Sequence, residues 1–81
     1  MIRVQFFGQV REIANGNETE VADCSTVGSL LCLLSESFGH DFRPEGLIVM
    51  VNGRHIAHTG FLETPLQAGD LVSVFPLIGG G

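Results

Sequence analysis

Apolar and polar residues alternate at the start of the chain, which is the pattern of a β-strand with one buried face. Ile2, Val4 and Phe6 fall on one side at a period of two. Phe7 makes the opposite side partly apolar, as expected where something covers that side too. The stretch ETEVADC, residues 18–24, predicts a second strand with a charged edge.

The clearest element is a helix that begins shortly after this second strand. Ser25 or Thr26 is placed to cap its first turn. Gly39 stands where a left-handed residue commonly ends a helix. The apolar residues at helical spacing on one face are Val27, Leu30, Leu31, Leu34 and Phe38. A single shorter helical turn is expected at Val10, Ile13 and Ala14.

The second half of the chain predicts two further strands joined by a loop. LIVMVNG, residues 47–53, is strongly apolar and ends in a turn pair, which favours a central strand. Residues 54–70 form the loop region, with room for one short strand near Phe61. LVSVF, residues 71–75, is the last strand, and Pro76 is expected to stop its ladder because proline has no N–H donor.

This order of elements predicts an α+β domain of the β-grasp type, with a mixed sheet of four to five strands packed on one main helix. The link from the second strand through the helix to the third provides the crossover that a parallel pairing requires. We expect residues 1–76 to form the domain and residues 77–81 to form a flexible glycine tail.

The charge balance restricts the partners. The 81 residues carry a net charge of −5, with four arginines and no lysine. This argues against nucleic acid, whose phosphates need a basic patch, and suits a partner with a basic docking surface. No apolar run approaches the roughly 20 residues of a membrane span, and because the sequence opens directly into strand-like residues we expect no signal peptide. We therefore expect a cytoplasmic protein without a membrane partner.

Few residues offer catalytic chemistry. Cys24 and Cys32 are expected to be structural thiols, with Cys32 buried in the run SLLCLLS. His55 and His58 are spaced like two metal ligands, but without an obvious third ligand we favour solvated loop histidines. No nucleophile-histidine arrangement can be placed, and an iron–sulfur ferredoxin would need four cysteines. The chain is not expected to be a catalyst on its own.

The stretch VSVFPLIGGG at the end of the sequence is the remaining candidate. A frayed terminus or a cloning remnant would be the ordinary explanation. However, glycines give a peptide its narrowest cross-section, and residues 77–81 reach at most about 17 Å when extended. A terminal carboxylate on Gly81 would be an unhindered acyl centre. These properties favour a tail that enters the active site of another enzyme.

Several stretches together resemble the ubiquitin-like sulfur carriers. They are IRVQFFGQVREIAN, STVGSLLCLL, VMVNG, LQAGDLVSVFP and the terminal Gly-Gly, and they cover essentially the whole chain. Within that family the chain is most similar to the small subunit of molybdopterin synthase, a relative of the thiamine sulfur carrier. The pair Phe75-Pro76 favours the molybdopterin branch.

The resemblance implies a carrier cycle with no cofactor bound to the chain. A partner related to ubiquitin-activating enzymes uses ATP to adenylate Gly81, and a sulfurtransferase persulfide then leaves a thiocarboxylate. The tail enters the large subunit of molybdopterin synthase and donates sulfur for the dithiolene. Gly79 and Gly80 would give access to Gly81. The partner-binding residues implied are Phe75, Pro76, Leu77 and Ile78.

Two departures from the family pattern keep alternatives open. Leu77 stands where the family often has a second proline, and the chain ends with three glycines. Carriers for thiazole, cysteine or tungsten-pterin pathways therefore remain alternatives. The absence of lysine excludes self-chaining through lysine but leaves open a modifier that forms isopeptides with target lysines. A non-covalent β-grasp binding module is the fourth alternative.

Overall fold

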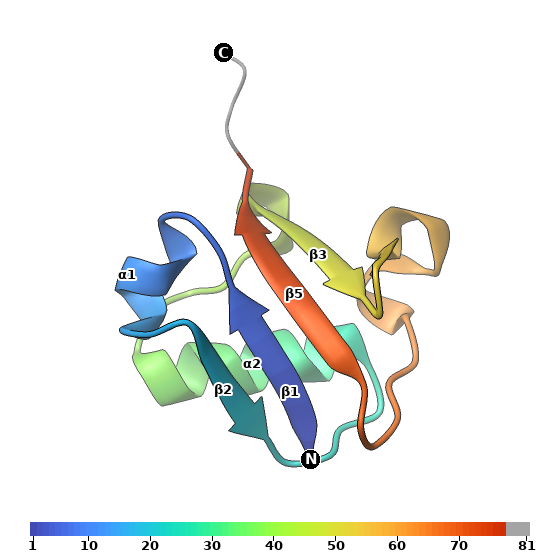
Figure 1. Ribbon diagram of the computed structural model, residues 1–81. Coiled ribbons are helices and arrows are strands. Elements are labelled where there is room, and N and C mark those ends of the chain that lie inside the picture. The colour runs from blue at the N-terminus through green and yellow to red at the C-terminus, as the bar shows by residue number, and fades with distance from the viewer. Residues whose placement is uncertain (78–81) are drawn as a thin grey trace.

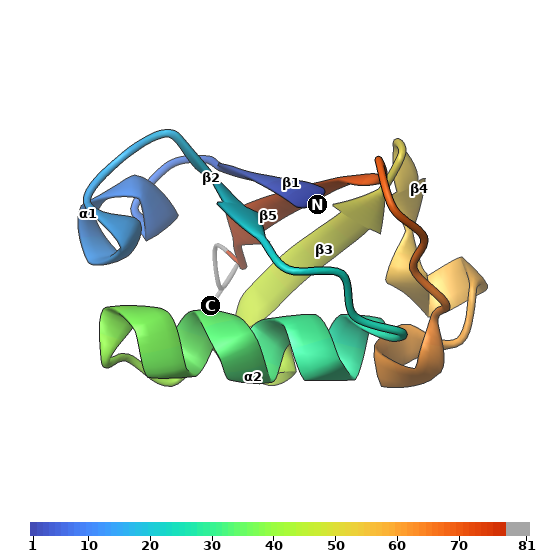
Figure 2. The same ribbon diagram turned by 90° about the horizontal axis from the view of Figure 1, so that it is seen from below.

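The computed structural model describes residues 1–77, which form a mixed sheet with one long helix packed across one face (Figures 1 and 2). The strands are β1 (Ile2–Phe6), β2 (Glu18–Val21), β3 (Leu47–Val51), β4 (Arg54–His55) and β5 (Leu71–Pro76). The α-helices are α1 (Val10–Ala14) and α2 (Val27–Phe38), and short 3-10 turns occupy Pro44–Gly46, Ile56–His58 and Phe61–Glu63. The predicted α+β, β-grasp arrangement is confirmed.

Helix α2 begins and ends where its sequence signals predict. The Oγ1 atom of Thr26 accepts a hydrogen bond from the backbone N–H of Ser29 at 3.2 Å, which satisfies one of the free donors of the first turn. Gly39 ends the helix with φ at 63°. The residues that α2 buries against the sheet are Val27, Leu30, Leu31 and Leu34.

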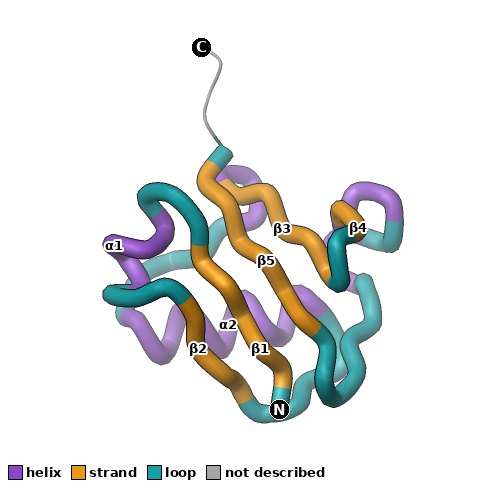
Figure 3. Tube along the Cα trace, in the orientation of Figure 1, coloured by secondary structure: helices purple, strands orange, loops and turns teal. Residues whose placement is uncertain are grey.

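The order of the strands is β2-β1-β5-β3-β4, with β1 and β5 in the centre (Figure 3). These two strands run parallel, and Val4 lies opposite Val72. Within residues 1–77, β1 and β5 are the neighbouring parallel strands. The chain crosses from β2 through α2 to β3, as predicted, but β1 and β5 lie between those two strands, so β2 and β3 do not pair directly. The reason is that β1 and β5 carry fully buried valines and therefore occupy the centre. Helix α2 carries the chain past both of them.

A cluster of aromatic rings closes one end of the core below the sheet. The ring of Phe6 meets that of Phe38 edge-on at 5.8 Å and lies 6.3 Å from that of Phe42. Phe6 and Phe42 are buried and Phe38 is half-buried against them.

No helix within residues 1–77 is long and apolar enough to cross a membrane.

The structure corrects the predicted strands in the second half of the chain. The residues around Phe61 form a 3-10 turn rather than a strand, and Phe61 itself is 59% exposed. The additional strand lies earlier, at β4, where the turn Asn52-Gly53 folds Arg54 back onto Val51. A two-residue hairpin turn of this kind is favoured by left-handed residues, and both turn residues have positive φ.

The sequence predicted that Pro76 ends the ladder of β5, but the pairing with β3 continues past it. Pro76 lies opposite Leu47, and the next residue, Leu77, still donates its N–H to the C=O of Gly46 at 3.1 Å. In an antiparallel ladder alternate residues direct their N–H groups to opposite sides. The missing N–H of Pro76 therefore costs no bond to β3. The predicted tail lies outside the described residues, apart from Leu77.

Candidate functional site

The chain leaves the sheet at the end of β5 (Figure 1). Large apolar side chains gather there on the face opposite α2. Val72 and Val74 are buried toward α2, so Phe75 lies on the other face because side chains alternate along a strand. Phe7 reaches the same place from the end of β1 and donates its N–H to the C=O of Val74 at 3.0 Å. The rings of Phe7 and Phe75 stack with centroids 4.3 Å apart.

Strand β3 completes this apolar surface. Ile48 lies opposite Phe75 in the antiparallel pair, and Met50 lies two residues further along the same face. A cavity of about 490 Å³ is lined here by Phe7, Gly8, Ile48, Met50, Phe75, Pro76 and Leu77. We call Phe7, Ile48, Met50, Phe75, Pro76 and Leu77 the exit platform, because the chain leaves the fold from it.

A close approach between Gly8 and Pro76 fixes the edge of the exit platform. Gly8 has φ at 57°, a left-handed conformation that favours glycine. A Cβ atom at this position would stand 2.9 Å from the Cγ atom of Pro76. Gly8 therefore lets the turn after β1 lie directly against the last residue of β5, so that turn holds the point where the chain departs.

Arg11 adds a cation beside the exit platform. Its Nε atom donates a hydrogen bond to the C=O of Phe6 at 3.0 Å, which holds the side chain back toward β1. Its guanidinium carbon lies 5.8 Å from the centroid of the Phe7 ring, within the range of a cation–π contact. The exit platform thus offers a partner an apolar surface with a positive group next to it.

The predictions from the sequence included some residues of the exit platform and omitted others. Phe75 and Pro76 are half-buried in the exit platform, and Leu77 is 51% exposed at its edge. Ile78, Gly79, Gly80 and Gly81 lie outside the described residues. The residues not selected from the sequence are Phe7, Ile48 and Met50. The period-two alternation of LIVMV carried the signal for the last two, but a continuous apolar run conceals which face each residue takes.

The position of Cys32 differs from the prediction that its thiol is buried. Cys32 is exposed, because it lies two residues from both Leu30 and Leu34, so helical spacing turns it away from their buried face. Cys24 is half-buried, and burial raises the pKa of its thiol.

The two histidines lie close together without forming a metal site. Their ring centroids are 6.1 Å apart, and Nδ1 of His55 accepts a hydrogen bond from the N–H of Ala57 at 2.9 Å. No group of three side chains that could hold a metal ion occurs within residues 1–77.

The exit platform is an apolar surface at the root of the chain's last residues. Comparison with known proteins gives the family of the chain. The model of the ThiS family matches residues 4–81. The chain belongs to the ThiS family. This match covers β1 from Val4 and continues through the exit platform to Gly81.

Two relatives place this ThiS-family chain more closely. A protein of Archaeoglobus fulgidus provisionally named a sulfur carrier protein is 34% identical, over 83% of this chain and 88% of that protein. Small archaeal modifier protein 3 of Haloferax volcanii is 31% identical, over 99% of this chain and 98% of that protein.

A solved structure with a similar fold is small archaeal modifier protein 1 of Methanosarcina acetivorans. It superposes with a TM-score of 0.82 at 22% identity, over 99% of this chain and 95% of that one. The fold is therefore the ubiquitin-like β-grasp. The chain is a ThiS/MoaD-type sulfur carrier or a ubiquitin-like modifier of the small archaeal modifier type.

Proposed function

We propose that this chain is the sulfur carrier subunit of a molybdopterin synthase and that Gly81 carries the sulfur as a thiocarboxylate. The observation that carries the proposal is the exit platform, a partly exposed apolar surface from which the chain continues directly into Ile78 and the three glycines. The Phe75-Pro76 pair in this platform is the feature that favours the molybdopterin branch.

The proposed chemistry resides in the carboxylate of Gly81, which must be activated because a carboxylate is a poor acyl donor without a good leaving group. A carboxylate oxygen attacks the α-phosphorus of ATP in the partner adenylating enzyme, and pyrophosphate leaves. The terminal sulfur of a sulfurtransferase persulfide then attacks the acyl carbon, and AMP leaves with the former carboxylate oxygen. A thiol reductant cleaves the resulting S–S bond, so that the thiocarboxylate remains on Gly81.

The fold of this chain contributes binding and position rather than catalysis. Exposed apolar surface beside a site of transfer stabilises a complex when it is buried, by about 25 cal/mol for each Å². Phe75 lies just before the tail and Leu77 is its first residue, so a partner that covers both receives residues 78–81 in a fixed direction. Gly79 and Gly80 give that partner room to close around the chain. This is the role we assign to the adenylating enzyme and to the large subunit of molybdopterin synthase.

Reconstitution with the molybdopterin synthase large subunit tests the proposal. The chain bearing a thiocarboxylate is mixed with that subunit and the pterin precursor, and the dithiolene product is measured. We expect product in proportion to the thiocarboxylate added, none from the carboxylate form, and a stable complex of the two proteins. A chain that accepts sulfur but forms no complex would instead serve another sulfur pathway, such as thiazole, cysteine or tungsten-pterin synthesis.

Protein modification is the second candidate function. It is favoured by the 31% identity to Small archaeal modifier protein 3 over almost the full length of both proteins. The same activated Gly81 would then be attacked by the amine of a target lysine, with loss of the leaving group and formation of an isopeptide. Immunoblots of lysates from the native organism distinguish the two roles, because a modifier gives adducts of higher mass and a dedicated carrier gives free chain.

A further inference from the structure

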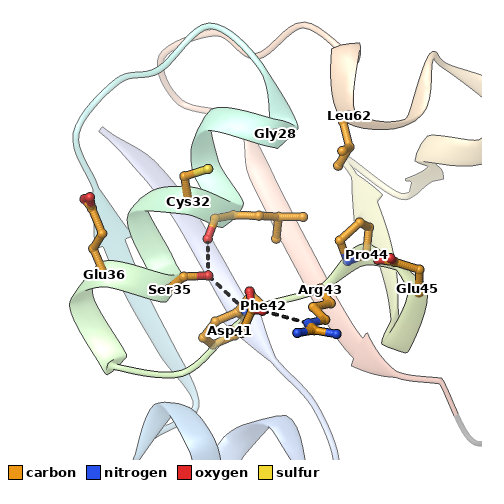
Figure 4. Close-up of a pocket in the computed structure, with 11 residues that line it drawn as sticks. Gly28, Cys32, Ser35, Glu36, Asp41, Phe42, Arg43, Pro44, Glu45 and Leu62 are labelled. Atoms are coloured by element: carbon orange, nitrogen blue, oxygen red, sulfur yellow. Dashed lines mark hydrogen bonds and ion pairs between the residues drawn. The ribbon is translucent and has the colours of Figure 1, made fainter.

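A second apolar depression lies beside α2, on the side of the sheet that α2 covers. It runs between α2 and the segment that leads into β3, and Leu62 projects into one end of it (Figure 4). Its volume is about 740 Å³. We call it the helix-side groove, and the apolar residues that line it are Leu31, Cys32, Phe42, Pro44 and Leu62.

The polar groups inside the helix-side groove already have partners. The hydroxyl of Ser35 donates to the C=O of Leu31 and accepts from the N–H of Phe42, both at 2.9 Å. Arg43 donates through Nε to Asp41 at 2.7 Å, and this bond raises the pKa of the guanidinium. No buried side-chain nitrogen or oxygen within residues 1–77 lacks a partner. The interior of the groove therefore offers no free buried polar group to orient a small molecule, and the charged groups available to a ligand stand at its border.

The remaining charges around the helix-side groove are negative. Glu36 and Glu45 are exposed at its border, on α2 and on the segment before β3. Asp41 and Arg43 pair with each other and cancel, so the two glutamates leave the groove with a net negative charge. This charge opposes phosphate groups of nucleic acids and of anionic lipids. It complements lysine and arginine side chains.

The turn at the end of the groove exposes two further large apolar side chains. Phe61 is 59% exposed and Leu62 is 40% exposed. Phe61 has φ at 53°, and the left-handed conformation costs a bulky residue about 1–2 kcal/mol. Gly28 lets this turn lie against α2, because a Cβ there would meet the carbonyl oxygen of Leu62 at 3.2 Å. The strained backbone of Phe61 and the exposed apolar side chains of this turn together indicate a contact surface.

We infer that the helix-side groove is a second protein-binding surface and that its partner is a protein segment with a large apolar side chain flanked by lysine or arginine. The apolar side chain enters between Cys32 and Leu62, and the basic side chains pair with Glu36 and Glu45. The exit platform lies on the opposite face of the sheet, so both surfaces are open to partners at the same time. This inference is independent of the proposed function.

To test the inference, peptides are selected from a random library displayed on phage, with the full chain as the target. We expect the enriched peptides to place lysine or arginine beside a large apolar residue. In spectra of the ¹⁵N-labelled chain, the enriched peptide is expected to shift resonances of residues 28–36, 41–45 and 61–63, and to leave those of Phe7 and Phe75 in place. No enrichment, enriched peptides without basic residues, or shifts confined to the exit platform would overturn the inference.

Two double variants with the same change in net charge separate local pairing from general attraction. Glu36→Lys with Glu45→Lys reverses the border of the groove, whereas Glu12→Lys with Glu20→Lys changes exposed residues of α1 and β2. We expect the first to weaken binding of the enriched peptide at least about tenfold and the second by no more than about twofold. Equal losses in both would contradict the assigned partner. Matching thermal midpoints establish that both variants fold.

Discussion

Phe7 and Phe75 stack face to face, with ring centroids 4.3 Å apart and an interplanar angle of 11°. Phe7 directly follows the first strand of the chain and Phe75 lies in the last, and the parallel pairing of β1 with β5 brings them together. The stack therefore ties the point where the chain leaves the sheet to the start of the fold. It makes the position at which the chain leaves β5 depend on the central strand pair.

A double-mutant cycle tests this stack. Phe7→Ala and Phe75→Ala each remove one ring, and the double variant removes both. Because stacked aromatic pairs contribute about 0.5–1.5 kcal/mol beyond the area they bury, we expect the two single losses of unfolding free energy to be non-additive by about that amount. Urea unfolding of the four proteins measures the coupling. Losses that simply add would mean that the rings do not interact in solution.

Gly8→Ala tests the contact between the first turn and Pro76. The new Cβ would stand 2.9 Å from Cγ of Pro76, and φ at 57° is unfavourable for alanine, so we expect a loss of about 1–2 kcal/mol. Gly16→Ala is the matched control, because nothing lies within 4 Å of a Cβ at that position. Thermal unfolding compares them. If the two variants were equally stable, Gly8 would not be holding the exit of β5.

The elements predicted correctly are those whose signals are local in the sequence. Helix α2 was placed with both ends, because Thr26, the apolar spacing and Gly39 lie within one continuous stretch. The exit platform was only partly predicted, because the position of Phe7 beside Phe75 depends on which strands become neighbours. The prediction for Cys32 was wrong for a different reason. It was expected to be buried because it lies in a run of apolar residues, but its position around the helix turns it toward solvent.

Alkylation with iodoacetamide checks the revised positions of the two cysteines. We expect Cys32 to react first, because it is exposed, and Cys24 to react more slowly, because it is half-buried and burial raises the pKa of its thiol. A raised pKa keeps the thiol protonated to higher pH, so the rate at Cys24 should begin to rise at higher pH than for an ordinary thiol. Peptide mapping after short exposure measures both rates. Faster labelling at Cys24 would contradict these positions.

Removal of Gly81 is expected to separate function from folding. Sulfur transfer should be lost, because the proposed acyl centre is gone, while the thermal midpoint should stay nearly unchanged, because glycine has no side chain to bury. Leu34→Asp provides the opposite case. Leu34 is fully buried under the sheet, so an unpaired charge there should unfold the domain. A large fall in the midpoint after removal of Gly81 would show that this residue supports the fold.

The intact mass of the chain after reaction tests the central claim most directly. The chain is incubated with an adenylating enzyme shown to be active, ATP and a sulfurtransferase loaded with persulfide, and is then weighed by mass spectrometry. The proposed function predicts an increase equal to the mass difference between sulfur and oxygen, located by fragmentation at Gly81 and absent without ATP. An unchanged mass under these conditions, or a gain located on Cys24 or Cys32, would contradict it.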